Sequence, residues 1–189
     1  MIKHTKRKIL RETPIHCVLK TEIKYSLQNS DTLNLLKKLI EIIEKRYYVT
    51  VAQYFVQKTH IHLLIITPLE KNLSLALGYI ASMLARNFNK RFNRKGRYWA
   101  DRFYSSVKTT AQQIRRAIHY IAMQIKGINP FQCRFSSLSD DRAIPKVVLN
   151  KIGVGKSVKK FEDVVFYGKA PYHYIRKTKV MNELQLSFF

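Results

Sequence analysis

The chain has 189 residues, of which 46% are hydrophobic and 12% aromatic, so it can build a core and is not a disordered polybasic tail. Lys and Arg number 35 against 12 Asp and Glu, and the resulting net charge of +23 points to a polyanionic partner, most often nucleic acid. No apolar run approaches the roughly 20 residues of a membrane span, and no secretory leader is evident. The two cysteines, Cys17 and Cys133, are far apart, lack metal-type spacing and give no disulfide framework, which suits a reducing cytosol. We therefore expect a cytoplasmic protein with no membrane partner.

Three strands and a helix are predicted in the first third of the chain. Residues 15–25 alternate in part, carry β-branched side chains and predict a strand. A helix is predicted after Ser30 and Asp31, a plausible N-cap, from apolar residues at helical spacing: Leu33, Leu36, Leu39, Ile40 and Ile43. Residues 47–56, rich in Tyr and Val, and residues 60–67, an apolar run ended by Pro68, predict two more strands.

A helix, a strand and a further helix follow. Apolar residues from Leu73 to Phe92 trace one face of a long helix, Gly96 breaks that pattern, and residues 98–107 predict a fourth strand. Thr110 and Gln113 have the spacing of a capping box, which opens a helix that should end near Gly127.

The predicted order of elements is β-α-β-β-α-β with one more helix at its end. That order is typical of an α+β, ferredoxin-like (RRM-like) fold with an antiparallel sheet. Residues 1–137 are expected to form this domain, and residues 138–189 a basic C-terminal extension of unassigned role. The segment at 153–157, GVGKS, is similar to a phosphate-binding loop, but Asn150 stands where that loop needs a glycine, so we discount it.

The positive charge is concentrated in residues 71–126, where Asp101 is the single acidic residue. Such a stretch predicts a phosphate-facing surface, although any one Lys or Arg can equally be a solvated surface charge. The candidates for contact with a nucleic-acid backbone are Arg86, Lys90, Arg91, Arg94, Lys95, Arg97, Arg102, Arg115 and Arg116.

Two histidines are candidates for a metal site. His60 and His62 are two residues apart on a predicted strand, so their imidazoles point to the same face. Imidazole pairs bind many divalent metals, and the spacing alone does not distinguish a metal site from two structural histidines.

The last predicted helix adds a row of polar residues beside its isoleucine stripe: Gln113, Arg116, Tyr120 and Gln124. Gln124 could supply a carbonyl oxygen to the same metal as the histidines, and Arg116 could neutralise a phosphate. Position alone does not select Tyr120 as a nucleophile, since the chain has eleven tyrosines. Tyr79 and Tyr104 lack an amide four residues on, and His119 points about 100° away from Tyr120 on the helix.

Four segments resemble one protein family. THIHLLI, around His60 and His62, looks like the histidine–hydrophobe–histidine (HUH) motif of single-tyrosine transposases of insertion-sequence type. YIAMQ, which starts at Tyr120, resembles their catalytic-tyrosine helix, and GRYWADRFYSS resembles a stretch common between the two motifs. INPFQCRFSS leans toward the REP-associated tyrosine transposases, and the resemblance covers residues 14–137. That branch usually has Asn-Pro where this chain has Gln124 and Ile125.

The resemblance implies a function and roles for the residues. It implies that His60, His62 and Gln124 hold a divalent metal, Mg²⁺ or Mn²⁺, and that Tyr120 is the nucleophile. The implied activity is cleavage and strand transfer of single-stranded DNA beside a hairpin, through a 5′-phosphotyrosine, by a possible homodimer. The alternatives are a domesticated nucleic-acid-binding protein of the same fold without transposition, and a replication or mobilisation nickase of the same superfamily.

Overall fold

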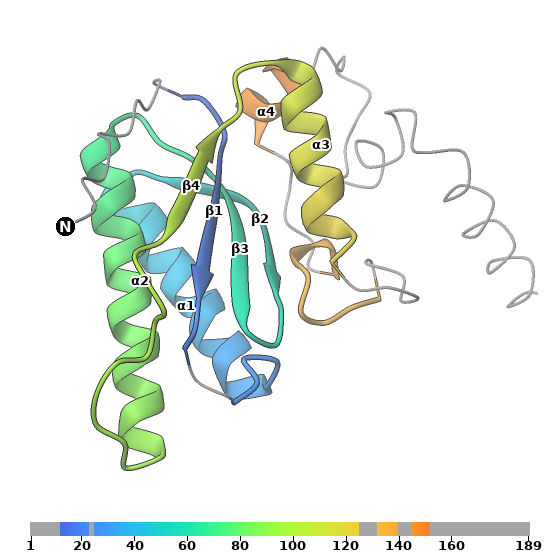
Figure 1. Cartoon of the computed structure of the whole chain (residues 1–189). Helices are drawn as coiled ribbons and strands as arrows, with labels where there is room; N and C mark the ends of the chain where they lie inside the picture. The colour runs from blue at the N-terminus through green and yellow to red at the C-terminus, as the bar shows by residue number, and fades with distance from the viewer. Residues whose placement is uncertain (1–11, 23–24, 125–131, 140–144, 152–189) are drawn as a thin grey trace, which may run out of the picture.

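The computed structural model describes residues 12–22, 25–124, 132–139 and 145–151. The predicted order of elements is confirmed in these residues, with short additions near the end (Figure 1). The elements are β1 (Ile15–Lys20), α1 (Ser30–Tyr47), β2 (Thr50–Val56), β3 (His60–Ile66), α2 (Glu70–Arg91), β4 (Tyr104–Val107), α3 (Ala111–Ala122), a 3₁₀ turn (Ser137–Ser139) and α4 (Lys146–Lys151). Among these helices, none is long and apolar enough to cross a membrane.

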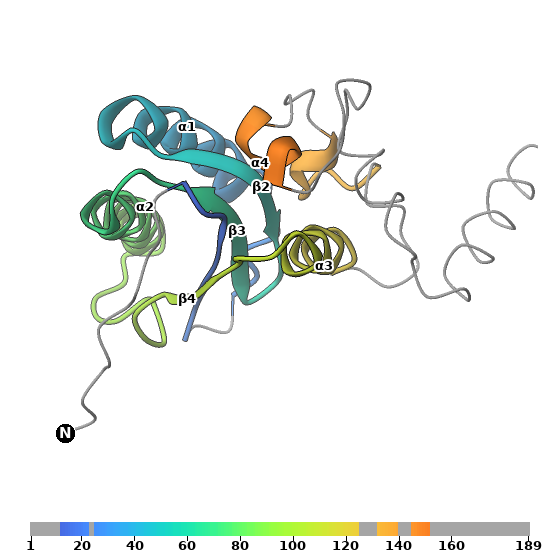
Figure 2. The same ribbon diagram turned by 90° about the horizontal axis from the view of Figure 1, so that it is seen from above.

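The four strands form one antiparallel sheet in the order β2-β3-β1-β4, which confirms the predicted ferredoxin-like arrangement. Helices α1 and α2 cover one face of the sheet and α3 packs against the other, as the view from above shows (Figure 2). Both central strands are therefore buried on two sides, and this explains why β3 reads as an uninterrupted apolar run after its histidines.

The two faces of the sheet carry two separate hydrophobic clusters. On β3, Ile61, Leu63 and Ile65 belong to the cluster under α1 and α2. Leu64 and Ile66, which point the other way, pack with the α3 residues Ile114, Ile118 and Ile121. His62 has the same parity as Leu64, so the alternation along the strand places it on the α3 face.

Several boundaries differ from the predicted ones. The strand predicted over residues 15–25 ends at Lys20, and the strand predicted over residues 98–107 begins only at Tyr104. Between them, Thr21 and Trp99 form an isolated bridge, and the Trp99 indole donates to the carbonyl oxygen of Ala81. The Glu22 amide donates to the Tyr98 carbonyl oxygen and the Ala100 amide to that of Lys20, so this segment stays beside the end of β1 while the Trp99 side chain anchors it to α2.

The ends of α1 also differ from the predicted ends by a few residues. The N-cap of α1 is Asn29, whose side chain accepts from the Thr32 amide, and not Ser30 or Asp31. At the other end Tyr48 adopts a left-handed conformation (φ 52°), which terminates the helix, so β2 starts at Thr50 and not at Tyr47.

Helix α3 begins as predicted and ends early. The capping box of Thr110 and Gln113 is present in both directions and is confirmed. The helix stops at Ala122 instead of running to Gly127, so Gln124 lies just beyond it, and residues 125–131 lie outside the described part of the chain.

The domain boundary at residues 137 and 138 stays a prediction, although Val148 of α4 is buried in the cluster under α3. The GVGKS segment also lies outside the described residues.

Candidate active site

His60 and His62 lie side by side at the start of β3, on the face covered by α3. The centroids of their rings are 4.7 Å apart, with the planes nearly perpendicular. His62 is 2% exposed, whereas His60 is partly exposed at the edge of the site and contacts the Thr59 hydroxyl at 3.0 Å. One face of a strand thus presents one deep and one accessible imidazole.

Tyr120 approaches the histidines from α3. Its ring centroid lies 5.6 Å from that of His62, in an edge-on arrangement, and its side chain remains 54% exposed. The helix is held there by Ile114, Ile118 and Ile121, all fully buried against the sheet. The tyrosine that the family resemblance selects therefore lies beside the histidine pair of its own chain, with its ring open to solvent on one side.

Gln124 contacts the backbone of the tyrosine helix and a second glutamine. Its side-chain nitrogen donates to the Tyr120 carbonyl oxygen at 2.6 Å, which continues the helical spacing past the end of α3. Gln57, which follows β2, donates from its side-chain nitrogen to both Oε1 (2.5 Å) and the backbone oxygen (3.1 Å) of Gln124. The amide is thereby fixed in place next to Tyr120, and Gln57 is a residue that the sequence did not single out.

A third histidine, His16 on β1, completes the cluster. Its Nε2 lies 2.9 Å from Nδ1 of His62, the two rings stack at 5.2 Å, and the Tyr120 ring lies 5.7 Å away. His16 is 46 residues from His62 in the sequence, and only the pairing of β1 with β3 brings them together. A lone histidine on a predicted strand carried no signal that could have identified it.

The surroundings lower the pKa of all three imidazoles of this cluster. Burial, with the nearby His60 and His16 adding to it, lowers the pKa of His62 to about 3. Burial and the positive charge of Lys108 lower the pKa of His16 to about 4. The pKa of His60 is lowered as well, by burial and by Lys20. Neutral imidazoles are the form that coordinates metal ions. Lys108 lies near His16 and Lys20 near His60.

The donor set fits a divalent metal held by neutral ligands. Nε2 of His62 is buried and has no hydrogen-bond partner, which is uncommon for a buried ring nitrogen and leaves one atom suited to a ligand. Within the described ranges there is no group of three or more His, Cys, Asp or Glu arranged to hold a metal. Imidazole nitrogens and an amide oxygen are both ligands of divalent metals, and substrate or water oxygens would complete such a site.

The predicted DNA-contacting residues do not form a single surface. Those from Arg86 to Arg97 lie on α2 and the loop after it, whereas Arg115 and Arg116 lie on α3, on the opposite face of the sheet (Figure 2). Their roles stay predictions.

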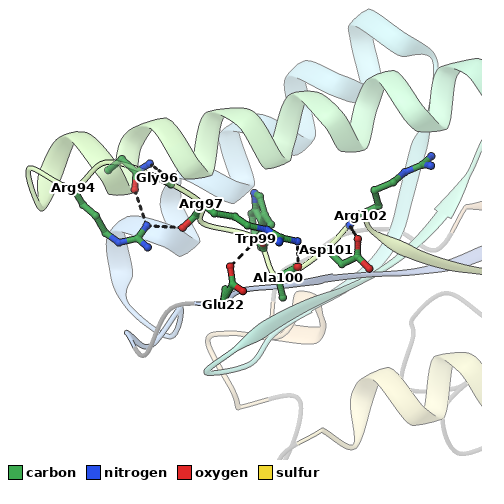
Figure 3. Close-up of polar contacts among 9 residues, drawn as sticks. Glu22, Arg94, Gly96, Arg97, Trp99, Ala100, Asp101 and Arg102 are labelled. Atoms are coloured by element: carbon green, nitrogen blue, oxygen red, sulfur yellow. Dashed lines mark hydrogen bonds and ion pairs between the residues drawn. The ribbon is translucent and has the colours of Figure 1, made fainter. Parts of the chain in front are cut away.

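Several of these arginines also bond to the protein itself. Arg91 pairs with Asp31, and Arg94 donates to the Arg97 carbonyl oxygen at 2.7 Å. Arg97 donates to the carbonyl oxygens of Trp99 and Ala100 and lies 3.6 Å from Glu22, so it ties the loop together (Figure 3). Arg102 is exposed and extends away from these contacts.

Comparison with known proteins gives one sequence family and one solved fold. No curated protein matches the chain. The structure of a REP-associated tyrosine transposase bound to a REP hairpin shares the fold, with a TM-score of 0.59 and 15% identity over 74% of this chain and 85% of that one. A putative transposase from Deinococcus radiodurans R1 aligns with 18% identity and a TM-score of 0.43, over 62% of this chain and 96% of that one.

The sequence family is identified by a family model. The model described as "Transposase IS200 like" matches residues 10–124, a range that begins before β1 and includes His16, His60, His62, Tyr120 and Gln124. The match spans more than half of the sequence and confirms the resemblance to the single-tyrosine transposases. The chain therefore belongs to the IS200-like transposase family.

Proposed function

We propose that this transposase cleaves single-stranded DNA with Tyr120 and rejoins the strand to a new 3′-hydroxyl through a covalent 5′-phosphotyrosine. The observation that carries the proposal is the position of the Tyr120 ring, 5.6 Å from that of His62 and on the sheet face that presents both His60 and His62. The close contact of the Tyr120 ring with His62 and His16 of the same chain supports cleavage in cis. The expected homodimer stays a prediction.

Tyr120 has the access that a nucleophile for DNA needs. The half-exposed ring can meet a phosphate without any opening of the core. An ordinary tyrosine has a pKa near 10, so only about one molecule in a thousand is a phenolate at pH 7. A positive charge beside the phosphate is therefore required to make the attack efficient.

The residues that would hold a metal are His60, His62 and Gln124. His62 offers a buried Nε2 with no hydrogen-bond partner, and Gln124, which bonds to the Tyr120 carbonyl oxygen, offers an amide oxygen held by Gln57. A bound Mg²⁺ or Mn²⁺ would polarise the scissile phosphate and stabilise the negative charge that develops on it. Because the protein ligands are all neutral, they would leave the full charge of the ion available to the DNA.

The reaction is an exchange of phosphodiester bonds. A bond forms between the phenolic oxygen of Tyr120 and phosphorus, while the bond from phosphorus to the 3′-oxygen of the preceding nucleotide breaks. The phenolic proton passes to solvent and the departing 3′-oxygen takes one up, which leaves a free 3′-hydroxyl and a 5′-phosphate on Tyr120. A second 3′-hydroxyl reverses the step on another strand, and no nucleotide cofactor is needed.

Single-stranded DNA that contains a hairpin is the proposed substrate. The net charge of +23 supports a polyanion, and the cations Lys20 and Lys108 near the histidines support a phosphate at this place. The solved relative with the same fold binds a REP hairpin, and this supports a hairpin as the partner of the present chain.

The test is a covalent-adduct assay with end-labelled, single-stranded hairpin DNA and Mn²⁺. Wild-type protein is expected to form an adduct that survives denaturation, and Tyr120→Phe to form none. Tyr104→Phe is the matched control, because Tyr104 is similarly exposed on β4, and it should react like the wild type. An adduct that persists in Tyr120→Phe would refute the assignment of the nucleophile.

A further inference from the structure

His16 contacts His62 directly, although the function proposed above assigns no role to His16. In the sheet, His16 lies opposite Leu64 and His62 lies opposite Val18, so the two histidines are diagonal neighbours on one face of adjacent strands. Their side chains are 8% and 2% exposed, and the nitrogen-to-nitrogen distance of 2.9 Å is that of a hydrogen bond. Two buried rings are thus linked at one defined pair of atoms.

The hydrogen bond restricts where the proton of His62 can be. A neutral imidazole carries one N–H, and in a bond between two ring nitrogens one of them donates and the other accepts. If His62 carried its proton on Nε2, that N–H would be a buried donor without a partner. With the proton on Nδ1, His62 donates to His16 and keeps a lone pair on Nε2.

We infer that His16 is a positioning residue, whose Nε2 accepts the Nδ1–H of His62 and so directs the lone pair of Nε2 of His62 toward the metal. The inference rests on the proposed function in one respect, namely that His62 binds the metal. Metal-binding histidines usually donate their second N–H to a carboxylate, a carbonyl or water. Here the acceptor is a neutral ring, which fixes the tautomer without adding a negative charge beside the DNA phosphate.

Two substitutions separate the hydrogen bond from simple packing. His16→Phe keeps a ring of similar size against His62 and Tyr120 but removes the acceptor. His16→Gln places a carbonyl oxygen near the position of the ring Nε2 and keeps it. We expect the dissociation constant for Mn²⁺ to rise by about 10- to 100-fold in His16→Phe and to return to within a few-fold of wild type in His16→Gln. Thermal unfolding establishes that each variant is folded, and His16→Leu, which also lacks the acceptor, replaces His16→Phe if that variant does not fold.

The second measurement needs no metal. Long-range ¹H–¹⁵N NMR spectra distinguish the two tautomers of a histidine ring, and the signals of His62 can be assigned from their loss in His62→Gln. The expected spectrum of the metal-free wild type has the proton of His62 on Nδ1, and the same tautomer in His16→Gln but not in His16→Phe.

Each outcome decides a stated point. A metal-free His62 protonated on Nε2, or a folded His16→Phe that binds Mn²⁺ as tightly as wild type, would overturn the positioning role. Wild-type protein that binds no Mn²⁺ at all would instead refute the metal site of the proposed function. In that case the tautomer measured without metal still decides whether His16 sets the state of His62.

Discussion

The buried isoleucines of α3 attach the tyrosine helix to the sheet, and substituting one of them tests whether this attachment positions Tyr120. Ile118 is 0% exposed, lies in the cluster between α3 and the sheet, and is two residues from Tyr120. Ile118→Ala removes three buried carbons, each contributing about 0.8 kcal/mol, and leaves a cavity. We therefore expect the free energy of unfolding to fall by about 2–5 kcal/mol.

The same change should affect cleavage beyond its effect on stability. A loosened α3 lets the Tyr120 ring move relative to His62, and a misplacement of about 1 Å at a reacting group can reduce a rate by up to about 100-fold. We expect the single-turnover rate of adduct formation, per folded molecule, to fall by at least about tenfold, which corresponds to about 1.4 kcal/mol.

Ile43→Ala is the matched control. Ile43 is also 0% exposed and helical, but it lies on α1 in the cluster on the opposite face of the sheet. It should lose a similar free energy of unfolding, measured in urea, and keep the wild-type rate of adduct formation at a temperature where both variants are folded. An equal loss of rate in the two variants would refute the view that the α3 cluster positions the tyrosine.

Three further outcomes follow from the site and from the helix that carries it. Mixing Tyr120→Phe with His62→Ala should restore no adduct if cleavage is in cis, whereas a dimer that cleaves in trans would recover about a quarter of its sites. Burial lowers the pKa of His62 to about 3 and of His16 to about 4, below the ordinary 6.5, so the unfolded chain binds more protons in that interval. The contribution of these two histidines to the free energy of unfolding should be fully present above about pH 6.5 and should decline as the pH falls toward 4, as measured in urea titrations. A pH profile no steeper than that of His62→Gln would contradict this. Thr110→Ala removes the oxygen that accepts from the Gln113 amide at 3.2 Å and should cost about 1 kcal/mol in the same titrations, while Thr110→Ser should not.

The basic residues show where prediction from composition reaches its limit. Charge density along residues 71–126 identified a stretch rich in cations, but the fold divides that stretch between two faces of the sheet. Arg94 and Arg97 bond to carbonyl oxygens of their own loop, an arrangement that depends on the path of the chain after α2 (Figure 3). The sequence shows how many cations a segment carries, whereas the fold determines which groups each of them contacts.

Local periodicity was sufficient for the order of elements and for the shared face of His60 and His62, because both depend on residues a few positions apart. The capping box of Thr110 was predictable for the same reason. Tertiary structure alone decided that His16 meets His62, that Gln57 holds Gln124, and that the Trp99 side chain anchors its loop on α2. These contacts join segments far apart in the chain, and their register is set by strand pairing and helix packing, which no local pattern encodes.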